Sequence, residues 1–128
     1  MEKEVIYNSD LYFEHKQWRR ELFFWEDELK SFKNRLNEIV TRWTDKNVLA
    51  QLEHFQNQFT HQAEIINTMQ SDINNHEANI AAHSKKGEDA LNLILIKKHI
   101  EFRNKMETQR SIYGNLKKEF FRFLSKYM

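Results

Sequence analysis

The sequence of 128 residues has no cysteine and no proline, and its only glycines are Gly87 and Gly114. Average composition would give a chain of this length about six prolines and nine glycines. Folds rich in β-sheet place such residues at turns about every 8–12 positions, so their scarcity excludes sandwiches, barrels and repeated βαβ units. The lack of cysteine also excludes disulfides, thiolate metal sites, iron–sulfur clusters and cysteine nucleophiles.

An excess of charge of one sign is absent too, because twenty Lys and Arg residues oppose nineteen Asp and Glu residues. Charge therefore gives no reason to expect nucleic acid or an anionic membrane as the main partner. The longest apolar runs, such as 22–25 and 93–96, are far shorter than the roughly 18–20 residues of a membrane span. The first ten residues carry mixed charges and lack the apolar stretch of a signal peptide. We expect a single soluble, cytoplasmic domain over residues 1–128.

What the chain does contain is a hydrophobic repeat that alternates spacings of four and three residues, the pattern of packed helices. With ten Phe and three Trp among its residues, it can bury a sizeable core. The breaks in the repeat fall at Thr44 and Asp45, which can cap a new helix, and at 84–87, which ends in a glycine. The repeat forms three series: Leu11, His15, Trp18, Leu22, Trp25, Leu29, Phe32, Leu36, Ile39 and Trp43; Val48, Leu52, Phe55, Phe59, Gln62, Ile66, Met69, Ile73, His76, Ile80 and His83; Asn92, Leu95, His99, Phe102, Met106, Gln109, Tyr113, Leu116, Phe120, Phe123 and Tyr127.

This periodicity predicts an all-α fold of three long helices with coiled-coil-like seams. The expected helices cover about 9–43, 46–84 and 88–127. Because short connections make sequential helices antiparallel, we expect an up-down-up bundle. In the register that the two turns impose, Glu28 of the first helix falls opposite Arg110 of the third.

Histidine interrupts the apolar series more often than any other polar residue, at His15, His76, His83 and His99. Burying an imidazole without a partner costs on the order of 1–3 kcal/mol, so these positions need an explanation. In the predicted register, His15, His76 and His99 lie within about one helical turn of one another, one from each helix. We therefore expect these three side chains to meet inside the bundle.

Three inward imidazoles can supply three nitrogen ligands and leave a fourth position open, as in catalytic zinc sites, and they also suit copper, nickel or iron. Glu14 and Glu77 adjoin two of these histidines in the sequence, and we expect them to support the site as hydrogen-bond acceptors or extra ligands. The alternative is that His15, His76 and His99 bond to one another without a metal and only fix the helix register.

Gln62 and Gln109 also occupy apolar positions, and the predicted register places them opposite each other in the second and third series. A buried amide pair of this kind specifies which residues face one another across a seam. We interpret the pair as a polar layer that fixes the register, with no catalytic role.

Several apolar residues lie off the seams and are predicted to face outward. They are Phe23, Phe24, Leu93, Ile94 and Ile100. An exposed apolar surface favours a homo-oligomer or a protein partner. The alternative is that part of it is covered by the segment 5–7.

The sequence lacks the spaced motifs that would identify an enzyme. No Glu-x-x-His pair of the di-iron type is present, no second histidine follows His76-Glu77 in zincin spacing, and two glycines cannot form a phosphate loop. Two interpretations remain: a non-catalytic binding or scaffold bundle, slightly favoured, and a metalloprotein that uses the three histidines for metal binding, storage or metal-assisted chemistry.

Overall fold

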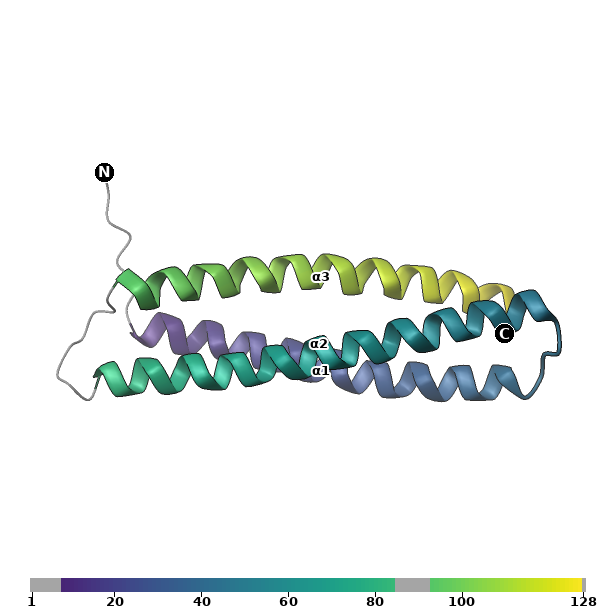
Figure 1. The fold of residues 1–128 in the computed structure, drawn as a ribbon, viewed down its shortest axis with the longest axis horizontal. Helices are drawn as coiled ribbons and strands as arrows, with labels where there is room; N and C mark the ends of the chain where they lie inside the picture. Colours follow the sequence, from purple (N-terminus) through teal and green to yellow (C-terminus); the bar gives the residue numbers. More distant parts are fainter. Residues whose placement is uncertain (1–7, 85–92, 128) are drawn as a thin grey trace.

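The chain folds into a bundle of three long helices, as the periodicity predicts (Figure 1). The computed structural model describes residues 8–84 and 93–127. Helix α1 spans Asn8–Val40, α2 spans Lys46–Ser84 and α3 spans Leu93–Tyr127. Helices α1 and α3 run in the same direction and α2 runs against both. The expected beginning of the third helix at 88 lies outside the described residues.

Helix α1 ends at Val40, earlier than the predicted residue 43. The backbone N–H of Arg42 bonds to the carbonyl of Ile39 at 2.9 Å, which tightens the last turn and ends the helix. Asp45 then caps α2, because its carboxylate accepts the N–H groups of Asn47 at 2.8 Å and Val48 at 3.2 Å.

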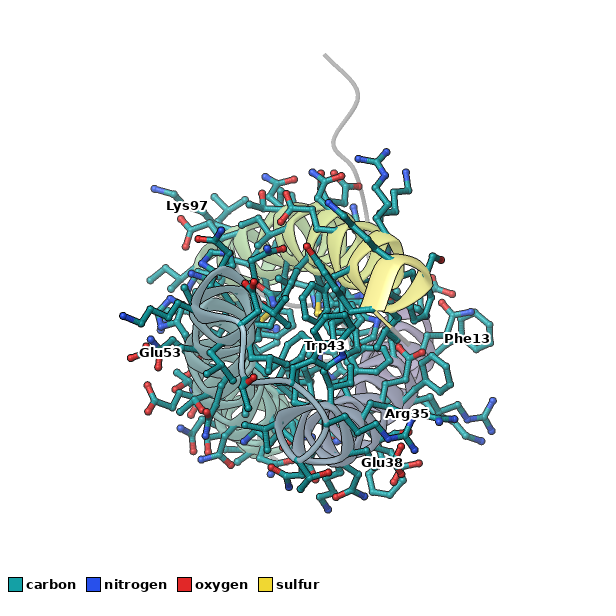
Figure 2. The ribbon with its side chains drawn as sticks, turned by 90° about the vertical axis from the view of Figure 1, so that its right-hand side faces the viewer. Phe13, Arg35, Glu38, Trp43, Glu53 and Lys97 are labelled. Atoms are coloured by element: carbon teal, nitrogen blue, oxygen red, sulfur yellow. The ribbon has the colours of Figure 1, made fainter. Side chains whose placement is uncertain are left out.

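Trp43 lies after the end of α1 and packs against one end of the bundle. Its indole N–H donates to the backbone carbonyl of Tyr127 at 3.1 Å, and the two rings meet edge to face. Viewed along the bundle axis in Figure 2, Trp43 lies near the centre, whereas the labelled charged side chains lie at the periphery. Half-burial of Trp43 therefore results from a cross-helix contact and not from a place in α1.

The core follows the three predicted series. Every buried residue within 10–82 and 93–127 belongs to one of them. A large apolar cluster extends from Trp18 to the end closed by Trp43. A small second cluster contains Leu11, Ile80 and Leu95 at the opposite end. Between the two clusters lies a layer of buried histidine side chains.

A ladder of ion pairs joins the parallel helices α1 and α3. Its carboxylates and its cations each recur every seven residues, so the pairs flank the core as the corresponding positions of a coiled coil do. The predicted pair of Glu28 with Arg110 is wrong by one such repeat. The pairs are Glu14 with Arg103, Glu21 with Arg110 and Glu28 with Lys117.

Among the described residues, no helix combines the length and the apolar character that crossing a bilayer requires.

Candidate metal centre

Three imidazoles, one from each helix, form a compact buried layer. His15 and His99 are 0% exposed and His76 is 8% exposed. The ring centroids of His15 lie 5.2 Å from those of both His76 and His99, and the latter two lie 5.5 Å apart. One nitrogen from each ring falls within 4.8 Å of the others. The structure thus brings together the three histidines that the sequence singles out.

Glu77 of α2 holds the ring of His15 across the α1·α2 seam. The distance from His15 Nδ1 to Glu77 Oε1 is 3.3 Å. Glu77 is itself fixed by Arg19, whose Nη1 donates to Oε1 at 2.8 Å and whose Nη2 donates to Asn74 at 2.9 Å. Because a carboxylate oxygen accepts, the proton of the neutral His15 ring belongs on Nδ1, and Nε2 carries the lone pair.

Glu14 of α1 holds the ring of His99 in the same way across the α1·α3 seam. His99 Nε2 donates to Glu14 Oε1 at 3.1 Å. Arg103 fixes this carboxylate with two bonds, from Nε at 3.0 Å and from Nη2 at 2.6 Å. The same reasoning leaves the lone pair of His99 on Nδ1.

These two hydrogen bonds leave one nitrogen of His15 and one of His99 for a metal. His76 Nε2 lies 3.3 Å from His99 Nδ1, and the lone pair on Nδ1 makes His76 the donor in this hydrogen bond. His15 Nε2 is buried and has no hydrogen-bond partner among the described residues. A buried polar atom without a partner costs free energy, and here its ring lies beside two other imidazoles.

The environment keeps all three rings neutral. Burial lowers the pKa of His15 and of His99, against the opposing effects of Glu77 and Glu14. Burial and the neighbouring His15 lower the pKa of His76 to about 4. Metal ligation needs neutral imidazole, so at pH 7 no proton on a second nitrogen competes with an ion.

The two carboxylates stay ionised. The hydrogen bonds from Arg19 lower the pKa of Glu77, and burial opposes this effect only in part. Burial raises the pKa of Glu14, but the hydrogen bonds and charges of Arg103 and His99 outweigh burial, so the net shift is downward. Both carboxylates can therefore orient a ligating imidazole while remaining outside the nitrogen set.

The spacing fits a first-row metal ion after a small adjustment. Zinc holds imidazole nitrogens at about 2.0–2.1 Å, which in a tetrahedron separates them by about 3.3–3.4 Å. The pair His76 Nε2 and His99 Nδ1 is at 3.3 Å. To complete the set, a bound ion would require ring rotations that bring the nitrogens closer by up to about 1.5 Å, and His76 would bind through Nε2 in the tautomer that carries its proton on Nδ1.

Trp18 packs against this layer from the side of the large core. Its ring centroid lies 4.9 Å from that of His99 and 5.4 Å from that of His15. An indole so close to two of the imidazoles provides a natural fluorescence reporter for a bound ion. Sequence reasoning placed Trp18 in the core but assigned it no part in the site.

Arg19 and Arg103 fix the two carboxylates; the predicted register places Arg19 within a turn of Glu77, but sequence reasoning assigned neither arginine a part in the site. They occupy positions just beside the seam, where cross-helix ion pairs form, and that periodic position is the signal that could have found them. The side chain of His83, the fourth histidine of the series, lies outside the described ones.

The other predicted residues lie elsewhere in the bundle. Gln109 Nε2 donates to Gln62 Oε1 in the buried layer predicted for them. That this pair serves to fix the register stays a prediction.

The predicted outer apolar surface does not form one patch. Phe23 and Phe24 of α1 are exposed, as are Leu93 and Ile94 at the beginning of α3. Ile100 is half-buried instead of exposed, which corrects the prediction for that residue.

The ion-pair ladder places Phe24 level with the middle of α3, roughly 28 Å along the axis from Ile94. Lys117 Nζ lies over the rings of both Phe24 and Phe121, at 5.7 and 5.8 Å from their centroids. The segment 5–7, the alternative cover for this surface, lies outside the described residues. An oligomer or partner role for these side chains stays a prediction.

Comparison of the chain with protein-family models, with curated proteins and with solved structures gave no match in any of the three. Function is therefore inferred from the geometry of this chain alone.

Proposed function

We propose that this bundle is a metal-binding protein whose centre consists of His15, His76 and His99. The observation that carries the proposal is the buried Nε2 of His15, which has no hydrogen-bond partner among the described residues and belongs to a ring whose centroid lies 5.2 Å from those of two other imidazoles. Two of the three rings are oriented by ionised carboxylates, the arrangement that metal-ligating histidines commonly show.

The donor set restricts the choice of ion. Three neutral imidazole nitrogens suit Zn²⁺, Cu²⁺, Ni²⁺ or Fe²⁺, and they do not suit Mg²⁺ or Ca²⁺, which take oxygen ligands. Glu14 and Glu77 are already engaged by Arg103 and Arg19, so neither carboxylate is free to act as a base. We therefore propose metal binding and not catalysis.

One observation favours a second candidate function, a scaffold bundle in which the histidines only fix the register. His76 and His99 bond directly to each other at 3.3 Å, which satisfies one nitrogen of each ring from within the layer. In this alternative, the layer needs no metal and added metal has no effect on stability.

Equilibrium dialysis of the purified chain against each of the four ions, followed by elemental analysis, separates the two candidates. The metal proposal predicts about one ion per chain, which a chelator removes. Free ion at about 100 times its dissociation constant should stabilise the fold by about 2.7 kcal/mol. The variant His15→Phe keeps a ring of similar size in the layer and should lose the ion.

The matched control is His61→Ala, which removes an exposed histidine of α2 and should bind metal as the parent does. If the parent binds no ion, or if His15→Phe binds one as well as the parent, the scaffold interpretation takes the place of the metal proposal.

A further inference from the structure

At the level of the three histidines, two of the three seams between helices are closed by ion pairs. Arg19 and Glu77 bridge α1 and α2, and Arg103 and Glu14 bridge α1 and α3. In each case the arginine lies over the carboxylate that holds an imidazole, so it covers the centre from that side.

The third seam, between α2 and α3, is different. No ion pair joins these two helices within the described part of the chain. In place of one there is a cavity of about 260 Å³ beside His76, with Phe102, Lys98 and Asn79 also on its wall. His76 is correspondingly the only one of the three histidines with any exposure.

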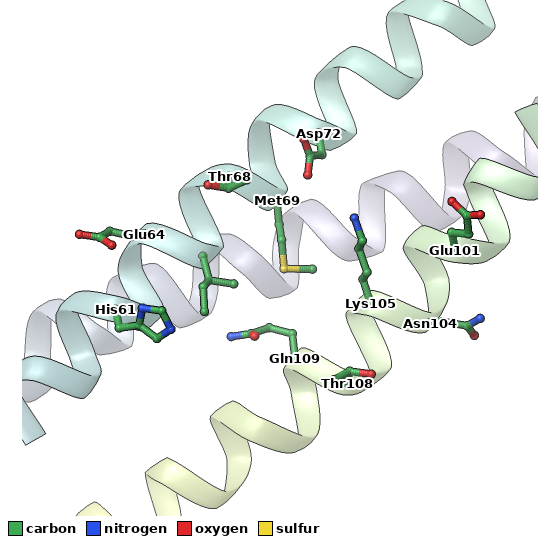
Figure 3. Close-up of a pocket in the computed structure, with 11 residues that line it drawn as sticks. His61, Glu64, Thr68, Met69, Asp72, Glu101, Asn104, Lys105, Thr108 and Gln109 are labelled. Carbon is green, nitrogen blue, oxygen red and sulfur yellow. The ribbon is translucent and has the colours of Figure 1, made fainter.

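This cavity continues into a larger groove of about 810 Å³ along the same seam (Figure 3). The two share Asp72, Glu101 and Lys105 as lining residues. In Figure 3 Met69 and Gln109 point into the space between the helices, and Lys105 reaches across it. Among the described residues, the histidine layer thus borders an open cavity at the α2·α3 seam, where His76 is partly exposed.

We propose that an ion held by His15, His76 and His99 takes a small anion as its fourth ligand, and that this anion reaches the metal through the α2·α3 cavity beside His76. The inference rests on the proposed metal site. Three protein nitrogens leave a tetrahedral ion one position for an exogenous ligand, and the cavity beside His76 offers room for it.

Size and charge define the class of ligand. The space beside His76, about 260 Å³, exceeds the roughly 30 Å³ that a water takes up and accommodates a small ligand, whereas the groove of about 810 Å³ is not lined by His76. Lys98 and Lys105 on the wall of the smaller cavity are balanced by Asp72 and Glu101, so the wall does not select a sign. The bound dication is then the largest local charge, and it favours a small monodentate anion.

Azide is a suitable probe, because it gives a charge-transfer band when it binds Cu²⁺. The Cu²⁺-loaded chain titrated with azide should develop this band. The variant Asn79→Trp places a large side chain at the cavity wall and should weaken azide binding at least tenfold. Its copper stoichiometry should equal that of the parent, because residue 79 is no ligand. Asn75→Phe blocks the same cavity from a neighbouring position and serves if Asn79→Trp does not fold.

The matched control is Thr60→Trp, which alters an exposed position of the same helix at a cavity between α1 and α2. It should bind azide as the parent does. Copper-loaded protein without an azide band, or equal azide affinity in the parent and both blocked variants, would overturn the inference while leaving the metal site in place. If the parent takes up no copper, the proposed metal site itself fails.

Discussion

The two ends of the bundle pack rings at nearly the same spacing but use opposite chemistry. At the end closed by Trp43, the ring of Phe120 lies 4.8–5.3 Å from those of Phe32, Phe55 and Phe59. At the other end, the imidazole centroids lie 5.2–5.5 Å apart. The helical repeat therefore places rings from different helices at similar centroid distances, whether the rings are apolar or polar.

The difference lies in what surrounds each layer. Phenyl rings need only to be removed from water, and the hydrophobic effect stabilises them wherever they meet. Each imidazole carries two polar nitrogens, and at the histidine end Glu14, Glu77, Arg19 and Arg103 are engaged to satisfy and orient them. The histidine layer therefore depends on specific hydrogen-bond partners, whereas the phenylalanine layer depends only on burial.

The largest expected effect comes from the phenylalanine end. Phe120→Ala should lower the free energy of unfolding by about 3–5 kcal/mol, because it removes a fully buried ring and leaves a cavity. Urea denaturation with and without Zn²⁺ should give the same loss, since this layer has no part in metal binding. Phe121→Ala, at an exposed neighbour, is the control and should cost much less.

Acidification should act only on the histidine end. The pKa of His76 is about 4 in the fold and about 6.5 when unfolded, so the unfolded chain binds more protons between these values. Its contribution to stability is thus complete above about pH 6.5 and is lost as the pH falls toward 4. His15 and His99 shift in the same direction.

In chelator, His76 alone should cost about 2 kcal/mol between pH 7.5 and pH 5. Urea denaturation across this range measures the loss, and His76→Phe should reduce its slope with pH. A free energy of unfolding that does not change from pH 7.5 to 5 contradicts neutral burial of the layer.

Glu77→Ala tests the support of the polar layer. The substitution leaves His15 Nδ1 buried without its acceptor, and we expect a loss of about 1–2 kcal/mol, because the partly exposed Arg19 can turn to solvent. Glu64→Ala, at an exposed position of the same helix, should change stability little. Thermal denaturation of both variants gives the comparison, and equal melting temperatures would remove Glu77 from the account.

The helices, the core and the meeting of the three histidines could be predicted because spacings of four and three residues define one face of a helix. Which residues of α1 lie opposite which residues of α3 could not be predicted in the same way. A shift by one seven-residue repeat puts the same kinds of position opposite each other, so the sequence alone does not distinguish Glu28 with Arg110 from Glu28 with Lys117.

The supporting carboxylates illustrate a second limit. Glu14 and Glu77 were singled out because they follow or precede a histidine in the sequence. Adjacent residues of a helix point about 100° apart, so neither carboxylate binds its neighbour. Each bonds a histidine of another helix instead, Glu77 that of α1 and Glu14 that of α3.

The smallest predicted effect concerns Gly114, which belongs to neither layer. A Cβ added there meets no atom within 4 Å, so Gly114→Ala should stabilise the fold by about 1 kcal/mol through helix propensity. Thermal denaturation should show this gain at any metal concentration. The variant also provides a stabilised background for substitutions at either end. A loss of stability would contradict the open space found around the Cβ position of residue 114.

The most direct test of the central claim is a ¹H–¹⁵N spectrum of the histidine side chains, recorded before and after addition of one equivalent of Zn²⁺. The metal centre predicts that His15 and His76 change at Nε2 and His99 at Nδ1, while the exposed His54 and His61 do not change. Spectra in which no buried imidazole responds, or in which only His54 and His61 do, would contradict it.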